Sequence, residues 1–283
     1  EIYCDGYICA ASGASFTDDT IVALGHDAGS DTHGMIAGKQ IKLNVDGKLQ
    51  ALNGISFQGF FNAHMRLTTR GCMKTGIREI ARNAGCHISA CFYGEDNHSL
   101  AETGLAIGAG DSDNTYWVMG RNAATACDNK ATYNVFQEFH AWGCTYGMKL
   151  APNANVSIHD YYADYQNTAL YYDGDTATQP YVFIDKVFGI FDDFAGMPCY
   201  FLSDKAHNYI GLKINLFIPN YRYFVKSGEL PSEFYRMWDI NFEHDVIINI
   251  DDLKTFTTLA EFTDKYGPID KNEMFSNLSV VYP

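Results

Sequence analysis

Basic residues are scarce in this sequence. Lys and Arg number 20 against 34 Asp and Glu, and the formal net charge is −14 at pH 7. Nucleic acids and anionic lipid surfaces are bound through basic patches, so this balance argues against either partner. No apolar run approaches the ~20 residues that a membrane-spanning helix requires. The chain has no charged-then-apolar signal segment, and because it starts at Glu1 rather than Met, we expect upstream regions to be missing.

Cysteine pairs at metal-binding spacing are also missing. No Cys-x-x-Cys occurs among the eight cysteines. Cys86 and Cys91 enclose His87, but no second pair of ligands stands at zinc spacing. A chain of this size has no need of disulfides, and several cysteines follow a glycine, as thiols in tight interior corners would. The sequence therefore predicts free buried thiols, assembly in a reducing cytoplasm, and neither a metal site nor a cofactor.

Long amphipathic helical patterns are nearly absent. Only 75–83 ("TGIREIARN") and 257–265 near the end are candidate helices. Hydrophobic residues make up 47% of the chain, enough for a real core, and no low-complexity linker divides it. The rest consists of short apolar segments interrupted by Gly, Asn, Asp and Ser, which is typical of strands and turns. Examples are Gln40–Val45, Gly54–Gln58, Cys86–Phe92, Gly104–Gly108 and Tyr116–Met119.

The second half of the chain is repetitive. Apolar cores recur about every 20 to 27 residues, a period that indicates stacked coils. These cores are Phe136–Ala141, Val156–Asp160, Val182–Val187, Tyr209–Asn215 and Tyr235–Asn241. Further apolar bursts fall between them, at Gly147–Leu150, Thr168–Tyr171 and Cys199–Leu202. The pattern predicts three short strands per coil and therefore an all-β fold, the single-stranded parallel β-helix.

Three segments, Gly54–Phe60, Asn83–Asp96 and Ala141–Gly174, resemble coils of the pectate-lyase-like, right-handed β-helix tailspikes of bacteriophages. The resemblance covers roughly residues 36–250. It implies a homotrimer in the virion tail, made in the host cytoplasm, that contacts other tail proteins. It also implies action at the bacterial cell surface, on capsule or O-antigen polysaccharide. The catalytic motifs of pectate lyases and polygalacturonases are not assembled here, so no catalytic residue is carried over.

The resemblance and the repeat together predict one solenoid with two flanking segments. Residues 1–35 form an N-terminal lead, residues 36–250 the parallel β-helix, and residues 251–283 a C-terminal cap or subunit contact. The last segment ends in an apolar strand, Leu278–Tyr282. A cap is expected because every solenoid has an open end to cover.

Candidate site residues follow from the alternation of strand side chains. With Phe139 pointing inward, Glu138 and His140 point outward, and with Ile158 inward, His159 points outward. Coils stack ~4.8 Å apart, so Glu138 could share a patch with acids of the next coil at a spacing suited to glycoside hydrolysis. The predicted patch adds Asp160 and Asp164 as acids, with Tyr161, Tyr162 and Tyr165 as platforms for sugar rings. A solvated acidic face or a seam between subunits is the alternative.

A second acidic group lies one coil further along the chain. It comprises Asp185 and Asp192, although the Asp192-Asp193 pair also suits a turn. The function predicted from these patterns is binding and hydrolysis of a bacterial surface polysaccharide. Two alternatives stay open: a non-enzymatic receptor-binding or structural virion protein, and a polysaccharide lyase. A lyase would use His140 or His159 as the base, with a nearby cation.

Overall fold

The structure is a computed structural model of the chain. The residues that it describes are 1–13, 20–25, 35–94, 101–172, 180–191, 200–204, 211–221, 238–242, 246–248 and 278–280. Among them no helix is long and apolar enough to cross a membrane.

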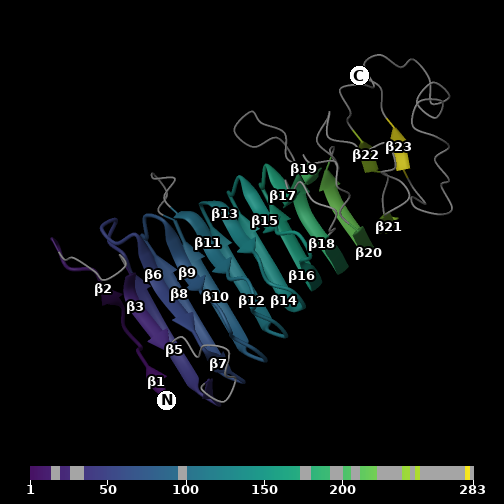
Figure 1. The fold of residues 1–283 in the computed structure, drawn as a ribbon. Helices are drawn as coiled ribbons and strands as arrows, with labels where there is room; N and C mark the ends of the chain where they lie inside the picture. Colours follow the sequence, from purple (N-terminus) through teal and green to yellow (C-terminus); the bar gives the residue numbers. More distant parts are fainter. Residues whose placement is uncertain are drawn as a thin grey trace.

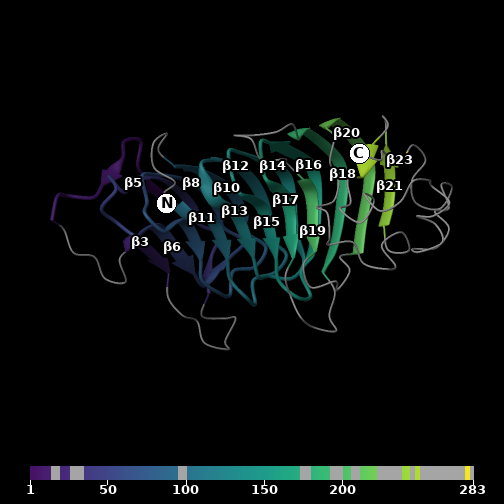
Figure 2. The same cartoon turned by 90° about the horizontal axis from the view of Figure 1, so that it is seen from above.

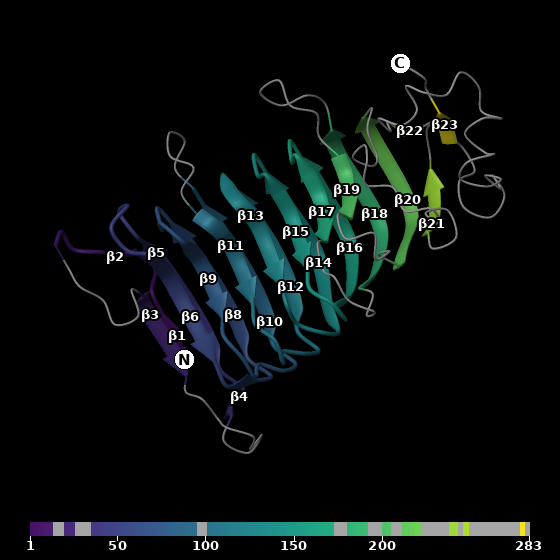
Figure 3. The ribbon, with the colours of Figure 1, turned by 45° about the horizontal axis from the view of Figure 1, so that its top comes forward.

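Two parallel sheets make up most of the described molecule (Figures 1 and 2). The large sheet has 11 strands in the order β1-β5-β8-β10-β12-β14-β16-β18-β20-β21, with β2 also paired to β5. The small sheet has eight, in the order β19-β17-β15-β13-β11-β9-β6-β3. The chain crosses from one sheet to the other and returns one strand further along, so the coils stack from the N-terminal end toward the C-terminal end (Figure 3).

The strands have the following bounds. The large sheet contains Ile2–Tyr3 (β1), Ile8–Cys9 (β2), Gln40–Asp46 (β5), His64–Arg70 (β8), His87–Tyr93 (β10), Thr115–Arg121 (β12), Asn134–Trp142 (β14), Asn155–Asp164 (β16), Tyr181–Phe191 (β18), Gly211–Tyr221 (β20) and Trp238–Phe242 (β21). The small sheet contains Thr20–Gly25 (β3), Asn53–Gln58 (β6), Thr75–Glu79 (β9), Ala101–Ile107 (β11), Ala123–Asn129 (β13), Tyr146–Leu150 (β15), Thr168–Tyr172 (β17) and Tyr200–Asp204 (β19). Two further parallel pairs join Ile36–Ala37 (β4) to Phe60–Phe61 (β7) and Val246–Ile248 (β22) to Leu278–Val280 (β23).

This architecture confirms the predicted all-β parallel solenoid. Each of the five predicted apolar cores overlaps one strand of the large sheet, from β14 to β21. The bursts between them overlap β15, β17 and β19 of the small sheet. The N-terminal lead contributes to both sheets, because β1 and β2 pair with β5 and β3 pairs with β6. The predicted right-handedness stays a prediction.

The expectation of three strands per coil is only partly met. In the described residues a coil has one strand in each sheet. In place of a third strand, one corner of each coil makes only minimal pairing. There β4 pairs with β7, and single parallel bridges join Phe61 to Ala84 and Ala84 to Ser112. The segments at this corner are too short to form a third sheet, since β4 and β7 have only two residues each.

The helix predicted at 75–83 is wrong. Thr75–Glu79 is strand β9, hydrogen-bonded between β6 and β11. Gly76 is buried there, and a Cβ on it would lie 2.8 Å from the backbone oxygen of Gly104 on the next coil. The stacking of coils therefore overrides the local helical pattern. The helix predicted at 257–265 lies outside the described residues.

Corners at the end of the large-sheet strands explain the small and amide residues in the sequence. One backbone N–H at this corner bonds the coil above, as Gly71 does to Tyr93 O and Asn122 does to Trp142 O. Gly71, Asn122 and Gly143 have φ of 59°, 56° and 64°, which glycine and asparagine tolerate best.

The core lies between the two sheets and contains a run of aromatic rings. The rings of Tyr116 and Phe136 stack with centroids 4.9 Å apart, and Phe139 lies 5.1 Å from Tyr161. Burying an aromatic side chain of this kind contributes about 1.5 to 3 kcal/mol. All seven described cysteines are free, as the sequence predicts. Their predicted burial is only partly met, because Cys72, Cys86, Cys127 and Cys144 are buried whereas Cys4 and Cys91 are partly exposed and Cys9 is exposed.

Candidate functional site

The outer face of the large sheet carries most of the predicted site residues. From β14 to β18 its strands are parallel and in register, so outward side chains of successive coils stand one above another. Strands β12, β14, β16 and β18 lie in the middle of the sheet (Figure 1). They contribute the acidic and aromatic side chains of this face.

A β-bulge shapes this face. Between β12 and β14 the register changes, because Tyr116 faces Phe136 whereas the next residue, Trp117, faces Glu138. Gln137 is the extra residue. Gln137 and Glu138 are both partly exposed, although strand side chains normally alternate between the two faces.

The following coils repeat this doubling. His159 and Asp160 are adjacent and partly exposed on β16, and Asp185 and Lys186 occupy the same place on β18. The face therefore has two polar columns side by side where a regular strand would supply only one.

The first column brings two carboxyl groups together. Glu138 is the direct partner of Asp160, and Asp160 is the partner of Lys186 on the next strand. Neighbouring parallel strands lie ~4.8 Å apart, so the two carboxyl groups extend from adjacent positions. The ammonium of Lys186 lies 3.7 Å from Asp160 Oδ1.

The second column contains an oriented histidine. Nδ1 of His159 lies 2.6 Å from Asp185 Oδ2, and Asp185 Oδ1 accepts a hydrogen bond of 2.9 Å from Asn215 Nδ2. A carboxylate on Nδ1 fixes the imidazole and leaves Nε2 for proton transfer. His159 is half-exposed, so Nε2 can reach a ligand on the face.

Aromatic rings border the acids. The His140 ring lies 5.2 Å from that of Trp142 and 5.3 Å from that of Tyr162, and its Nε2 is 3.1 Å from Asp164 Oδ2. The Tyr162 ring stacks on Phe188 at 5.1 Å. Such rings offer flat apolar surfaces to sugar rings.

Tyr162 is also close to the paired acids. Its partial burial, and then the charges of Asp160 and Glu138, raise the pKa of the Tyr162 hydroxyl. The hydroxyl therefore stays protonated at neutral pH and can donate a hydrogen bond to a ligand oxygen.

The structure brings most of the predicted residues together. Glu138, His140, His159, Asp160, Tyr162, Asp164 and Asp185 all lie on this face. The predicted outward orientation of Glu138, His140 and His159 is confirmed. Asp192 lies outside the described residues, and the catalytic and binding roles of the rest stay predictions.

Tyr161 is a correction. Its side chain is fully buried, and its hydroxyl donates a hydrogen bond of 2.9 Å to Ala169 O. Because His159 and Asp160 both point outward, the next residue must turn inward, and Tyr161 belongs to the core.

Tyr165 lies beside this face, at the corner where β16 ends. Its φ of 51° is unusual for a bulky residue, and earlier coils place glycine or asparagine at this corner. Its side chain is 37% exposed, so it stays a candidate platform at the edge of the face.

Sequence reasoning missed several residues of the same face, namely Trp117, Trp142, Lys186, Phe188 and Asn215. Trp117 is the direct partner of Glu138, and Phe188 is the partner of Tyr162. Strand alternation marks each as a possible outward residue, but only the register between coils places them beside the acids.

No family model, curated protein or solved structure matches this chain. The described residues contain no group of His, Cys, Asp and Glu that could hold a metal ion.

Proposed function

We propose that this protein binds a bacterial surface polysaccharide on the outer face of the large sheet and hydrolyses it. The observation that carries the proposal is the direct pairing of Glu138 with Asp160 on adjacent parallel strands, beside aromatic rings. Parallel β-solenoids are common among proteins that bind or degrade polysaccharides, which supports the same conclusion.

The two acids extend from neighbouring strands, and this backbone spacing is compatible with a retaining mechanism. Retaining glycosidases hold their carboxyl groups ~5 to 5.5 Å apart, close to the ~4.8 Å between neighbouring strands. Lys186 beside Asp160 suits a carboxylate that attacks the anomeric carbon. Glu138, which has Trp117 on its other side, would protonate the leaving oxygen and later activate water.

The aromatic rings would hold the sugar chain in position. Tyr162 is the partner of His140 on the neighbouring strand and stands two residues from Asp160, and Trp142 follows two residues after His140 on β14. A sugar ring that stacks there places its neighbour over Glu138 and Asp160. The Tyr162 hydroxyl supplies a hydrogen-bond donor at the junction.

The test uses purified protein and a panel of capsular and O-antigen polysaccharides. Reducing ends and ultraviolet absorbance are followed together. We expect new reducing ends without an absorbing product, and we expect Glu138→Gln and Asp160→Asn each to lower the rate at least about 100-fold, the scale of positioned acid–base groups. Glu102→Gln and Asp128→Asn, on the small sheet, are the matched controls. Full activity in both site variants would remove these residues from the mechanism.

A lyase is the second candidate, and one observation favours it. His159, held by Asp185, resembles an oriented base, and Lys186, which contacts the adjacent residue Asp160, supplies a cation on the neighbouring strand. An absorbing, unsaturated product in the same assay would identify a lyase and transfer the catalytic role to His159. If every glycan is bound and left intact, the protein is a receptor-binding module.

A further inference from the structure

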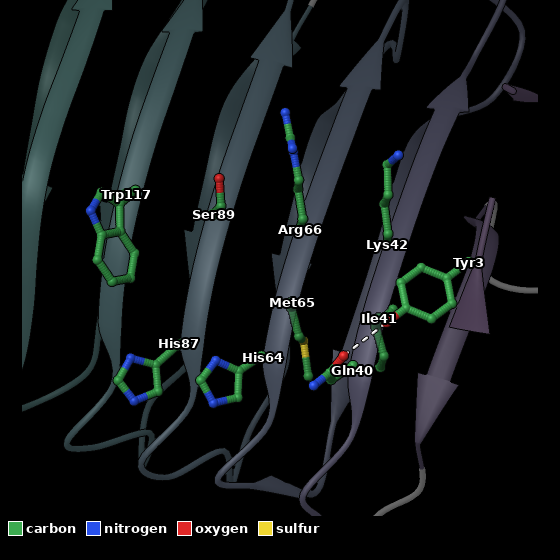
Figure 4. A pocket seen from close by; sticks show the side chains of 10 residues that line it. All are labelled: Tyr3, Gln40, Ile41, Lys42, His64, Met65, Arg66, His87, Ser89 and Trp117. Atoms are coloured by element: carbon green, nitrogen blue, oxygen red, sulfur yellow. Dashed lines mark hydrogen bonds between the residues drawn. The ribbon is translucent and has the colours of Figure 1, made fainter. Parts of the chain in front are cut away.

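A hollow of about 430 Å³ lies on the outer face of the large sheet near its N-terminal end (Figure 4). It crosses strands β1, β5, β8, β10 and β12, and we call it the N-terminal groove. No Asp or Glu lines it. Its lining includes Tyr3, Lys42, His64, Arg66, His87 and Trp117.

Two cations stand on adjacent strands in this groove. Lys42 and Arg66 are direct partners in the register between β5 and β8. Lys42 Nζ is 2.7 Å from the carboxylate of Asp5, whose side chain is 90% exposed. Arg66 is exposed and makes no hydrogen bond or ion pair with another described residue. Its planar guanidinium is thus free to bind a carboxylate through two hydrogen bonds.

Flat rings extend from these cations toward the paired acids. The rings of His64 and His87 stack with centroids 4.7 Å apart and an interplanar angle of 6°. The ring of Trp117 follows, 6.4 Å from that of His87, and is 41% exposed (Figure 4). Such a row can support sugar rings laid along the face.

The groove is continuous with the proposed catalytic pair. Arg66, Ser89, Trp117 and Glu138 are successive partners across β8, β10, β12 and β14. Three strand steps separate Arg66 from Glu138, or roughly 14 Å at ~4.8 Å per step. A polymer on this face would therefore reach both places at once, through different sugar residues.

We infer that the N-terminal groove binds an acidic sugar residue of the polysaccharide, with its carboxylate on Arg66 and Lys42 and its neighbour on Trp117. The inference rests on the proposed function, which makes the ligand a polysaccharide. It adds that this polysaccharide is acidic. Asp5 competes with the ligand carboxylate for Lys42, so Arg66 is the principal contact.

The test measures binding by titration calorimetry, with a glucuronic acid tetramer and the methyl ester of the same tetramer. The two probes share their rings and differ in charge. We expect the acid to bind at least about tenfold more tightly than the ester, and Arg66→Gln to remove most of that difference, as the loss of a charge-assisted pair does. Arg78→Gln, an exposed arginine of the small sheet, should leave binding unchanged.

Asp5→Asn gives the opposite sign and guards against misfolded variants. It frees Lys42, so the acidic tetramer should bind about two- to threefold more tightly than it does to wild type. Equal binding of acid and ester, or wild-type affinity in both Arg66→Gln and Asp5→Asn, would overturn the inference. So would the absence of any binding by the acidic tetramer.

The outcome is independent of hydrolysis. Glu102→Gln, on the small sheet, should bind the acidic tetramer as wild type does, because Glu102 lies outside the groove. A protein that cleaves a neutral polysaccharide and ignores the acid retains the proposed function and loses this inference. A protein that binds the acidic tetramer but cleaves no polysaccharide retains this inference and loses the proposed hydrolysis.

Discussion

Asp111 and Glu79 are two buried carboxyl groups that share one polar cluster. Tyr116 donates a hydrogen bond of 2.6 Å to Glu79 Oε2, and the backbone N–H of Asn83 donates one of 2.7 Å to Asp111 Oδ1. Burial raises the pKa of Asp111 to about 7. Burial, and then the charge of Asp111, raises the pKa of Glu79 well above its usual range. At least one of the two carboxyl groups is therefore expected to carry a proton in the folded protein near neutral pH.

This cluster predicts a pH dependence of stability. A carboxyl group whose pKa is raised on folding binds more protons in the folded state, so it stabilises at low pH and loses that contribution as pH rises through the folded pKa. For Asp111 the window runs from about pH 4, its unfolded pKa, to about pH 7. We expect the free energy of unfolding of wild type to fall across this window.

Asp111→Asn should flatten that slope, since the amide is neutral at every pH. Each pKa unit corresponds to about 1.4 kcal/mol, so the variant should gain about 1 to 4 kcal/mol on wild type between about pH 5 and pH 8. Urea unfolding at several pH values measures it. Asp113→Asn, at the exposed neighbour, is the control. If the free energy of unfolding varied with pH identically in wild type and Asp111→Asn, folding would not raise the pKa of Asp111 and the prediction would be wrong.

At the scale of strands, the packing of Phe92 connects the three successive strands β10, β11 and β12. The Phe92 ring is 1% exposed and fills the space above Gly104 and Gly120. A Cβ on either glycine would overlap the ring. The narrow interior can therefore accommodate the Phe92 ring only because positions 104 and 120 are glycines.

Gly120→Ala should destabilise the protein by about 1 to 3 kcal/mol, because the buried ring has no room to move aside. Phe92→Leu removes the overlapping ring atoms, so Gly120→Ala should cost clearly less in that background. Chemical denaturation of the four proteins measures the coupling. Gly6→Ala, where a Cβ meets open space, is the control. Equal costs in the two backgrounds would mean that another contact restricts position 120.

The same scale decides the geometry of the site. Gln137 inserts one residue into β14, and β16 and β18 continue with two outward residues each. This insertion is what sets His159 beside Asp160 and turns Tyr161 inward. A regular alternation would have sent one member of each outward pair into the core.

At the scale of the whole molecule, the outer face of the large sheet changes in charge along its length. Lys42 and Arg66 stand at its N-terminal end, whereas Glu138 and Asp160 stand in its middle. For a chain of net charge −14, a groove that carries two cations, of which only Lys42 is paired with an acid (Asp5), is a local exception. It suits an anionic polymer held at one end and cleaved further along.

The resemblance to phage tailspikes adds a prediction for assembly. We expect multi-angle light scattering to give a mass close to three times the 31.6 kDa of one chain. Exposed tyrosines outside the site, such as Tyr133 and Tyr181, are available for subunit contacts. A mass of one chain at every concentration would separate this protein from the trimeric tailspikes and leave the glycan proposal untouched.

Local patterns in the sequence are enough to predict the class of fold and the outward residues of the candidate site. Short apolar segments at a period of about 20 to 27 residues predict stacked strands, because each strand buries a few side chains before a corner. Strand alternation likewise places Glu138, His140 and His159 outward, since it depends only on neighbouring residues. The free buried thiols follow from their small neighbours.

Which residues of different coils lie side by side follows only from the three-dimensional fold. The register that pairs Glu138 with Asp160, and Lys42 with Arg66, depends on how coils of unequal length stack, which no single segment encodes. The bulge at Gln137 and the strand at Thr75–Glu79 have the same origin, because contacts with adjacent coils override local pattern. The candidate site is assembled from residues of successive coils, so it forms only when those coils stack on one another.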